Sequence, residues 1–355
     1  MRTGKISENI LKRSILRQIK NSRKEVIKGA GVGEDCAFLS LEDPLSGKES
    51  ENAVMAVSTQ TVTLPVENAA FLAVMAAANN LAAAGAIPVA ATLAFTFPEG
   101  IQESRLKELM HQAESCAVEL NMQIVGGHTE VSNIVDQPVV TSTVMGMLQK
   151  KAQSVNGGKT GTEGQGKSNS VSAAGLDIVV SKWIGMEGTS IIAVEKEAEL
   201  LKRYPVNLVL LAREQGKYLS VASEAAIALK SGVYAMHDAR NGGIFGALWE
   251  VSQKLGVGLC IDLKKIPVRQ ETIEVCEFYN LNPYELLSGG SLIMITRDGQ
   301  GLVRSLEAEG ISAVVIGSTN NGNDKIVTNQ DESRYLGAPV PDEIYKLSFI
   351  QEEIS

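Results

Sequence analysis

The run from residue 68 to residue 84 constrains the fold more than any other part of the chain. It reads NAAFLAVMAAANNLAAA and is apolar nearly all round. Alanine and leucine favour a helix, and Gly85 is suited to end it. A helix that is apolar on every side must be covered on every side. The sequence therefore predicts a layered core with this helix between other elements.

Strand-like and helix-like segments alternate on both sides of one polar stretch. In the first half we expect strands at 36–39, 53–58, 88–95, 123–125 and 138–148, and helices at 5–20, 68–84 and 103–120. In the second half we expect strands at 176–181, 258–262 and 291–295, helices near 189–203, 219–231 and 242–256, and a final helix–strand pair near 301–317. This order favours a mixed α/β (α+β) architecture.

The chain of 355 residues suits two domains. Residues 151–170 are rich in Gly, Ser and Lys and have little apolar content, which is typical of a flexible loop. We therefore predict an N-terminal domain at 1–150, a flexible loop at 151–172 and a C-terminal domain at 173–350.

Charge and composition exclude several classes of protein. The net charge of -8 argues against a nucleic-acid partner. The basic residues of 12–24 alternate with apolar ones, as on an amphipathic helix with a solvated face. There is neither a signal-like N-terminus nor a run of about 18 apolar residues, so we expect a cytoplasmic protein without membrane contact. The four cysteines form no C-x-x-C pair, which argues against a zinc knuckle and a disulfide framework.

Three glycine-rich segments carry the candidate site residues. In GVGEDCA, Gly31 and Gly33 would let backbone amides approach a phosphate, and Glu34 and Asp35 are candidate ligands of a metal ion. An ordinary acidic turn is the alternative interpretation.

The second segment is GGHTE, which comprises Gly126, Gly127, His128, Thr129 and Glu130. Its glycines permit close approach of a nucleotide, its threonine and histidine could contact phosphate, and Glu130 is a third candidate metal ligand. His128 could equally be a packed histidine.

The third segment, MHDARNGG, places Asp238 before Gly242 and Gly243, which lead into an apolar helix. A helix N-terminus attracts anions, so these three residues are candidate phosphate-binding residues. A helix cap formed by Asp238 or Asn241 is compatible with that role.

Taken in order with STQTVTLPVEN (58–68), NNLAAAGA (79–86), LDIVVSKWIGMEGT (176–189) and LLSGGSLIM (286–294), these segments resemble the AIR synthase (PurM-like) superfamily, and within it the HypE branch of hydrogenase maturation proteins, along nearly the whole chain. The resemblance implies an N-terminal domain that pairs in a homodimer to form a β-barrel, and a C-terminal α/β domain. It also implies ATP and Mg2+ as cofactors, and activation of an amide or carboxyl oxygen by phosphorylation. A protein partner in a maturation complex would fit the same branch.

The chain departs from the family pattern at three places. Gln60 and Asn80 stand where the family has aspartates that help to hold magnesium, which predicts a weakened Mg2+ site. Arg240 lies one position away from the usual arginine, which puts its phosphate contact in doubt. No cysteine follows Cys276, so we expect no standard carbamoyl dehydratase, whose thiocyanate is carried on a C-terminal cysteine.

Three hypotheses follow. We favour a nucleotide-binding protein with weakened or altered catalysis in hydrogenase or metallocentre maturation. The alternative is an active ATP-dependent enzyme that phosphorylates an amide or carboxyl oxygen of an unknown substrate. The third is a structural dimer without a ligand; the retained GVGED and GGHTE segments argue against it. No catalytic residue is assigned.

Overall fold

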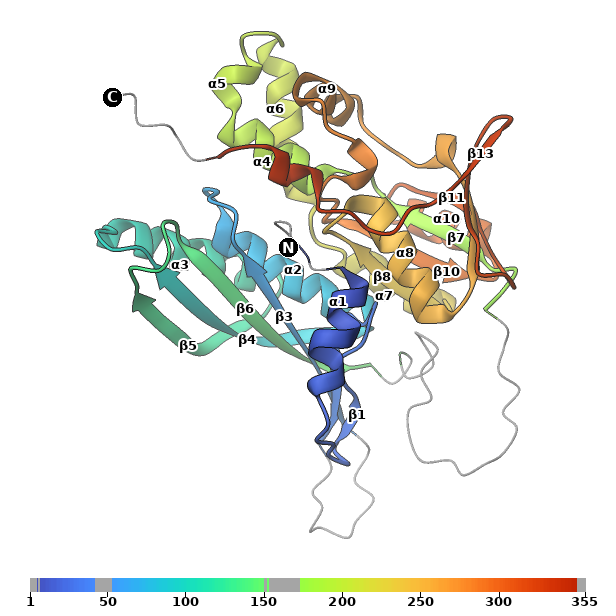
Figure 1. Ribbon diagram of the computed structural model, residues 1–355, viewed down its shortest axis with the longest axis horizontal. Helices are drawn as coiled ribbons and strands as arrows, with labels where there is room; N and C mark the ends of the chain where they lie inside the picture. The colour runs from blue at the N-terminus through green and yellow to red at the C-terminus, as the bar shows by residue number, and fades with distance from the viewer. Residues whose placement is uncertain (1–4, 6, 42–52, 150–151, 153–172, 350–355) are drawn as a thin grey trace.

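The computed structural model describes residues 5, 7–41, 53–149, 152 and 173–349. Two β-sheets lie side by side, one formed by the first half of the chain and one by the second (Figure 1). The fold is the expected mixed α/β type. The flexible loop predicted at 151–172 lies outside the described residues, apart from Ala152.

The first sheet has six strands in the order β1-β2-β3-β6-β4-β5. Their bounds are β1 Val26–Lys28, β2 Ala37–Ser40, β3 Val54–Val62, β4 Ala86–Phe97, β5 Gln123–Val131 and β6 Val139–Leu148. Strands β4 and β5 are parallel and are joined by α3 (Glu103–Glu119), whereas the other neighbours are antiparallel. Helices α2 (Ala69–Ala83) and α3 pack on one face of this sheet.

The predicted buried helix is confirmed as α2, in which every residue but Phe71 is buried. One side of α2 packs on β3, β4 and β6, and the other side contacts the second half of the chain at α7 and β8. Asn79 fastens this contact, because its side chain donates to the carbonyl oxygen of Leu219 and accepts from the amide of Val221. Burial from both sides explains why the helix is apolar all round.

The expected break of a strand at Gly126-Gly127 is wrong, since β5 continues through both glycines to Val131. A Cβ atom at Gly127 would lie 1.8 Å from the carbonyl oxygen of Leu93 on β4. The glycine thus permits close approach of two neighbouring strands instead of ending one of them.

The second sheet has seven strands in the order β13-β12-β9-β11-β7-β10-β8. Their bounds are β7 Asp177–Ser181, β8 Ala235–Ala239, β9 Gly258–Asp262, β10 Ser291–Thr296, β11 Ala313–Asn320, β12 Lys325–Asn329 and β13 Glu332–Tyr335. The helices of this half are α4 Met186–Glu195, α5 Glu197–Leu200, α6 Val206–Glu214, α7 Ala222–Ser231, α8 Gly243–Leu255, α9 Gln270–Tyr279 and α10 Gly299–Glu307. Helices α6 and α9 and strands β8, β12 and β13 were not expected from the sequence.

The N-terminal helix expected at 5–20 is short and irregular. It consists of α1 (Glu8–Ile10), a π-helical turn at Leu11–Ile15 and a 3-10 turn at Leu16–Gln18, and none of these residues is buried. Its basic side chains are exposed as predicted, but its apolar side lines a cavity instead of a core. Across the described residues, no helix is long and apolar enough to cross a membrane.

Candidate functional site

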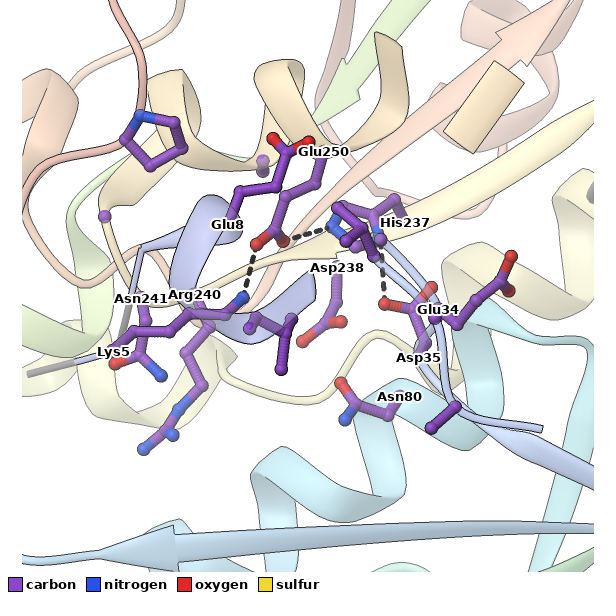
Figure 2. A pocket seen from close by; sticks show the side chains of 18 of the residues that line it. Lys5, Glu8, Glu34, Asp35, Asn80, His237, Asp238, Arg240, Asn241 and Glu250 are labelled. Carbon is purple, nitrogen blue, oxygen red and sulfur yellow. Dashed lines mark hydrogen bonds and ion pairs between the residues drawn. The ribbon is translucent and has the colours of Figure 1, made fainter. Parts of the chain in front are cut away.

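A cavity of about 460 Å³ lies where the two halves of the chain meet (Figure 2). Its walls come from the N-terminal helical segment, the loop before β2, strand β3, helix α2, strand β8, the start of α8 and the segment 339–345. Among the residues described, its carboxylates are Glu8, Glu34, Asp35, Asp238, Glu250 and Asp342, and its basic side chains are Lys5, His237 and Arg240. Carboxylates therefore dominate the lining.

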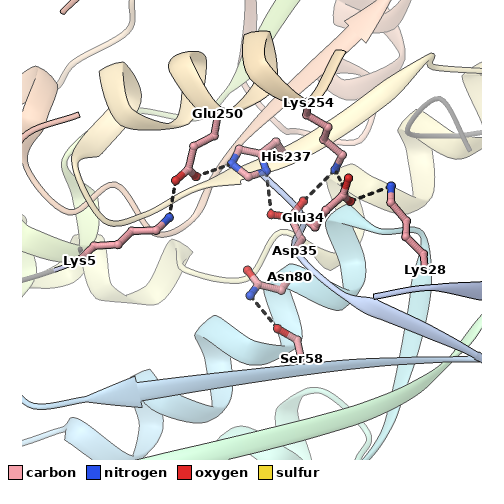
Figure 3. Close-up of polar contacts among 9 residues, drawn as sticks. All are labelled: Lys5, Lys28, Glu34, Asp35, Ser58, Asn80, His237, Glu250 and Lys254. Carbon is pink, nitrogen blue, oxygen red and sulfur yellow. Dashed lines mark hydrogen bonds and ion pairs between the residues drawn. The ribbon is translucent and has the colours of Figure 1, made fainter. Parts of the chain in front are cut away.

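A buried chain of charged side chains crosses the cavity (Figure 3). His237 on β8 has its Nδ1 atom 2.7 Å from Oδ1 of Asp35 and its Nε2 atom 3.1 Å from Oε2 of Glu250 on α8. Lys5 forms an ion pair with Glu250 at one end, and Nζ of Lys254 lies 3.4 Å from Oδ2 of Asp35 at the other. Three elements distant in sequence thus hold His237 in one orientation.

Asp238, the neighbour of His237 on β8, faces Asn80 on α2. When the amide of Asn80 is turned to satisfy its neighbours, it donates to Oδ1 of Asp238 at 2.7 Å. It then accepts from Ser58 Oγ and Gln60 Nε2, both at 2.8 Å. Gln60 and Asn80, at which the sequence predicted a weakened Mg2+ site, therefore lie together in the wall that Asp238 also lines.

The pKa values of the buried groups follow from these contacts. Burial alone would lower the pKa of His237, but the charges of Asp35 and Glu250 and the hydrogen bond to Glu250 outweigh burial and raise it to about 10. Burial would raise the pKa of Asp35, yet His237 and Lys254 hold it below its ordinary value. For Asp238, burial and the nearby charge of Asp35 both raise the pKa. Of the two carboxylates, Asp238 is thus the one whose charge is the less well compensated.

Of the three metal ligands predicted from the sequence, only Glu34 and Asp35 line the cavity. Glu34 is held by Lys28 at 2.7 Å and lies 3.9 Å from Lys254. Glu130 lies on β5, the edge strand of the first sheet, where its carboxylate is 3.4 Å from the exposed His128. Within one chain, the structure does not bring Glu130 to Asp35.

The predicted phosphate-binding residues also divide into two groups. Gly31, Gly33, Asp238 and Gly242 line the cavity, whereas Gly126, Gly127, His128 and Thr129 are exposed on β5; the ninth residue, Gly243, is buried at the start of α8 and is not in the cavity wall. At the start of α8, the amide of Gly242 donates to Oδ2 of Asp342 at 2.7 Å, and that of Gly243 donates to the carbonyl oxygen of Arg240. Both backbone amides, of Gly242 and Gly243, therefore already donate hydrogen bonds to acceptors within the chain.

Arg240 is directed to a carboxylate of its own chain. Its Nε atom lies 3.1 Å from both carboxylate oxygens of Glu187, and its Nη2 atom lies 2.8 Å from Oε1. Both side chains are almost fully buried. Arg240 therefore forms a bidentate ion pair with Glu187 within the chain.

Sequence reasoning did not assign roles to His237, Glu250, Lys254 or Asp342. His237 had a signal, because it directly precedes the candidate Asp238. Glu250 and Lys254 lie one helical turn apart on α8 and contact His237 and Asp35 respectively, but this is visible only once α8 is placed against β8. No local pattern marks Asp342.

Comparison with known proteins agrees with this architecture. The sequence model for "AIR synthase related protein, N-terminal domain" matches residues 33–148, and that for "AIR synthase related protein, C-terminal domain" matches residues 173–329. A putative hydrogenase expression/formation protein of Methanocaldococcus jannaschii is 25% identical over 346 residues, which cover 96% of both chains. Carbamoyl dehydratase HypE of Rhodobacter capsulatus is 25% identical over 252 residues, 69% of this chain and 68% of that protein.

Solved structures share the fold at lower identity. HypE in a HypE–HypF complex superposes with a TM-score of 0.69 at 19% identity, covering 93% of this chain and 99% of the other. HypE in complex with ATP gives a TM-score of 0.63 at 18% identity, covering 96% and 97%. These structures show the two-domain HypE/AIR-synthase fold. On the two matched domains, the chain belongs to the AIR synthase related protein family.

Proposed function

We propose that the chain is a nucleotide-binding protein of hydrogenase or metallocentre maturation, with catalysis altered from that of HypE. The observation that carries the proposal is the cavity of about 460 Å³ between the two halves, which is within the usual size range of a small-molecule site. The glycine-rich loop 29–33 forms part of its wall. Support also comes from the HypE structure that contains ATP and has the same fold.

The charge of the cavity sets a condition on this function. A polyphosphate would meet six carboxylates, while Arg240 is already paired with Glu187 and Lys5 with Glu250. Like charges at such short range disfavour binding strongly in a partly buried site. The proposed nucleotide therefore binds together with a cation.

Mg2+, the ion that the family implies, fits this site poorly. Mg2+ requires near-octahedral oxygen coordination. Here two amides, Gln60 and Asn80, stand in place of carboxylates, and the imidazole of His237 lies among the remaining donors. We derive no catalytic step through Mg2+, and the loss of these carboxylates is why we infer altered catalysis.

A homodimer belongs to the same proposal. The face of the first sheet opposite α2 and α3 exposes apolar side chains, including Ile87, Val89 and Met147. A second copy that covers this face would bury them, and β5 offers a free edge on the same sheet. Gly126–Glu130 is exposed on that edge, so in this proposal these residues act at a site that a second copy completes.

The structure of HypE with HypF supports a protein partner for this chain as well. We propose such a partner as part of a maturation complex, separate from the contact between two copies.

The nucleotide proposal is tested by thermal unfolding with a non-hydrolysable ATP analogue, measured with no metal, with Mg2+ and with Zn2+ or Mn2+. At an analogue concentration of 100 times Kd, binding should stabilise the folded state by about 2.7 kcal/mol. Asp238→Asn should abolish the shift, whereas Asp298→Asn, at the start of α10 outside the cavity, should retain it.

Absence of a shift with every nucleotide and every dication would contradict nucleotide binding and favour the structural dimer. ATP hydrolysis that requires Mg2+ would instead support the active enzyme of the alternative hypothesis.

A further inference from the structure

Three side chains of different chemistry converge beside the cavity. Asp35, His237 and Asp238 each offer one ligand atom, and these atoms lie within 4.8 Å of one another. His237 is 4% exposed and Asp238 7%. Two carboxylate oxygens and one imidazole nitrogen form a donor set that suits a transition-metal ion better than Mg2+.

The orientation of His237 is that of a metal ligand. Its Nε2 atom lies 3.1 Å from the carboxylate of Glu250, and Lys5 in turn pairs with Glu250. Histidines that bind metals generally donate their other N–H group to a carboxylate in this way. Nδ1 is left facing Asp35, and although it lies 2.7 Å from Oδ1 it makes no hydrogen bond of ordinary geometry there. Nδ1 is thus a buried polar atom aimed into the cluster, and a metal ion bound there displaces the proton that Asp35 and Glu250 favour in the metal-free protein.

Asn80 can serve the site in two orientations. With its nitrogen toward Asp238, it donates a hydrogen bond and satisfies the carboxylate without a metal. With its oxygen toward Asp238, two acceptor oxygens face one another and the amide nitrogen faces Gln60 Nε2, so this orientation requires a cation between the two oxygens. Asn80 is therefore able to act as a fourth ligand, through its oxygen, once an ion is present.

We propose that Asp35, His237 and Asp238 bind a divalent transition-metal ion of the Zn2+ type, in place of the Mg2+ of the family, with Asn80 as an additional oxygen ligand. When Asp35, His237 and Asp238 alone bind the ion, one coordination position stays open towards the cavity for a ligand of the protein, and Asn80 fills that position in its absence. Lys254, near Oδ2 of Asp35, compensates part of the carboxylate charge. The role of the metal rests on the proposed function. The test of metal binding uses metal ions alone, without nucleotide. Metal binding can therefore fail while nucleotide binding holds, and the reverse.

The experiment titrates the metal-free protein with Co2+, a spectroscopic substitute for Zn2+, and follows visible absorption. We expect one Co2+ per chain, displacement by stoichiometric Zn2+, and no displacement by a 100-fold excess of Mg2+. The spectrum should lack sulfur-to-cobalt charge-transfer bands, since none of the three ligands is a cysteine. Charge-transfer bands, or displacement by equimolar Mg2+, would overturn the proposal.

Variants locate the ion. His237→Gln should weaken Co2+ binding about 100-fold or more, because it removes a ligand, and Glu250→Gln should weaken it about 10-fold by releasing the imidazole. His111→Gln is the matched control, because His111 is exposed on α3 away from the cavity, and it should bind Co2+ as the wild type does. Asn80→Asp should bind about 10-fold more tightly, because it adds a charged ligand. If His237→Gln does not fold, Asn80→Asp still tests the site. An unchanged Co2+ affinity in Asn80→Asp would then contradict the proposed site.

Discussion

The two sheets of this molecule differ in how much of their apolar surface is buried within one chain. In the first sheet, the residues of β6 alternate between buried and half-buried, because α2 and α3 cover one face only. In the second sheet, every residue of β8 and β10 is buried. The part of the second sheet around β8 and β10 is covered within one chain, whereas the first sheet presents an apolar face that needs a cover. The contrast explains why we assign self-association to the first half.

The largest effect should follow from a charge on the open face. Ile87→Asp replaces an apolar side chain that is 56% exposed on β4. In a symmetric dimer each interface would carry two such charges, so we expect at least about a 1000-fold weaker dimer, or about 4 kcal/mol. Analytical ultracentrifugation measures the change.

Ile273→Asp, on α9 of the second half, is the control, because Ile273 is 38% exposed on an element outside that face. It should leave the dimer intact. An Ile87→Asp protein that sediments as the wild type does would show that this face is not the interface.

A matched pair of methionines sharpens the comparison. Met294 on β10 is fully buried, and Met294→Ala should lower the free energy of unfolding by about 3 kcal/mol through lost contacts and a cavity. Met147 on β6 is 40% exposed, and Met147→Ala should cost less than about 1 kcal/mol in the monomer. Urea unfolding at low protein concentration gives both values. Equal costs would mean that the two sheets are equally covered within one chain.

The smallest effect concerns a buried carboxylate of the second half. Burial raises the pKa of Asp342 to about 7, against an unfolded value near 3.8. The folded protein therefore holds this proton more tightly than the unfolded chain does. Stability from this group is fully present below pH 4 and is lost as the pH rises to 7.

Asp342→Asn should make the decline in unfolding free energy between pH 4 and pH 7 smaller by about 2 kcal/mol, as followed by chemical denaturation across that range. Asp298→Asn makes the same change in a side chain that also accepts from a backbone amide, at the start of α10, and should leave the slope unchanged. An unchanged slope in Asp342→Asn would show that this carboxyl titrates normally.

Much of the fold could be predicted from local sequence patterns, because strongly apolar segments must be buried in the core. Helix α2 is the clearest case, since its composition demanded cover on both sides. The N-terminal helix was less predictable, because its apolar residues line a cavity and impose no regular packing. The strand through Gly126-Gly127 was missed because Gly127 is required by the close approach of the β4 backbone, and β4 is distant in sequence.

The candidate site was predicted only in part. Gln60 and Asn80 were expected to lie together near Asp35, and they line one cavity with it. The part played by His237 depends on Glu250 and Asp35, which reach it from α8 and from the loop before β2. Such convergence arises from tertiary packing, and no spacing in the sequence encodes it.

The cavity wall includes both Lys5 and Tyr345, so residues from nearly opposite ends of the described chain enclose the same volume. During synthesis on the ribosome, the first sheet can assemble long before residue 345 has emerged. The cavity, however, cannot close until then. A ligand that needs the whole wall would therefore bind only after residue 345 has been made, and its capture would distinguish such chains from ones that stop earlier.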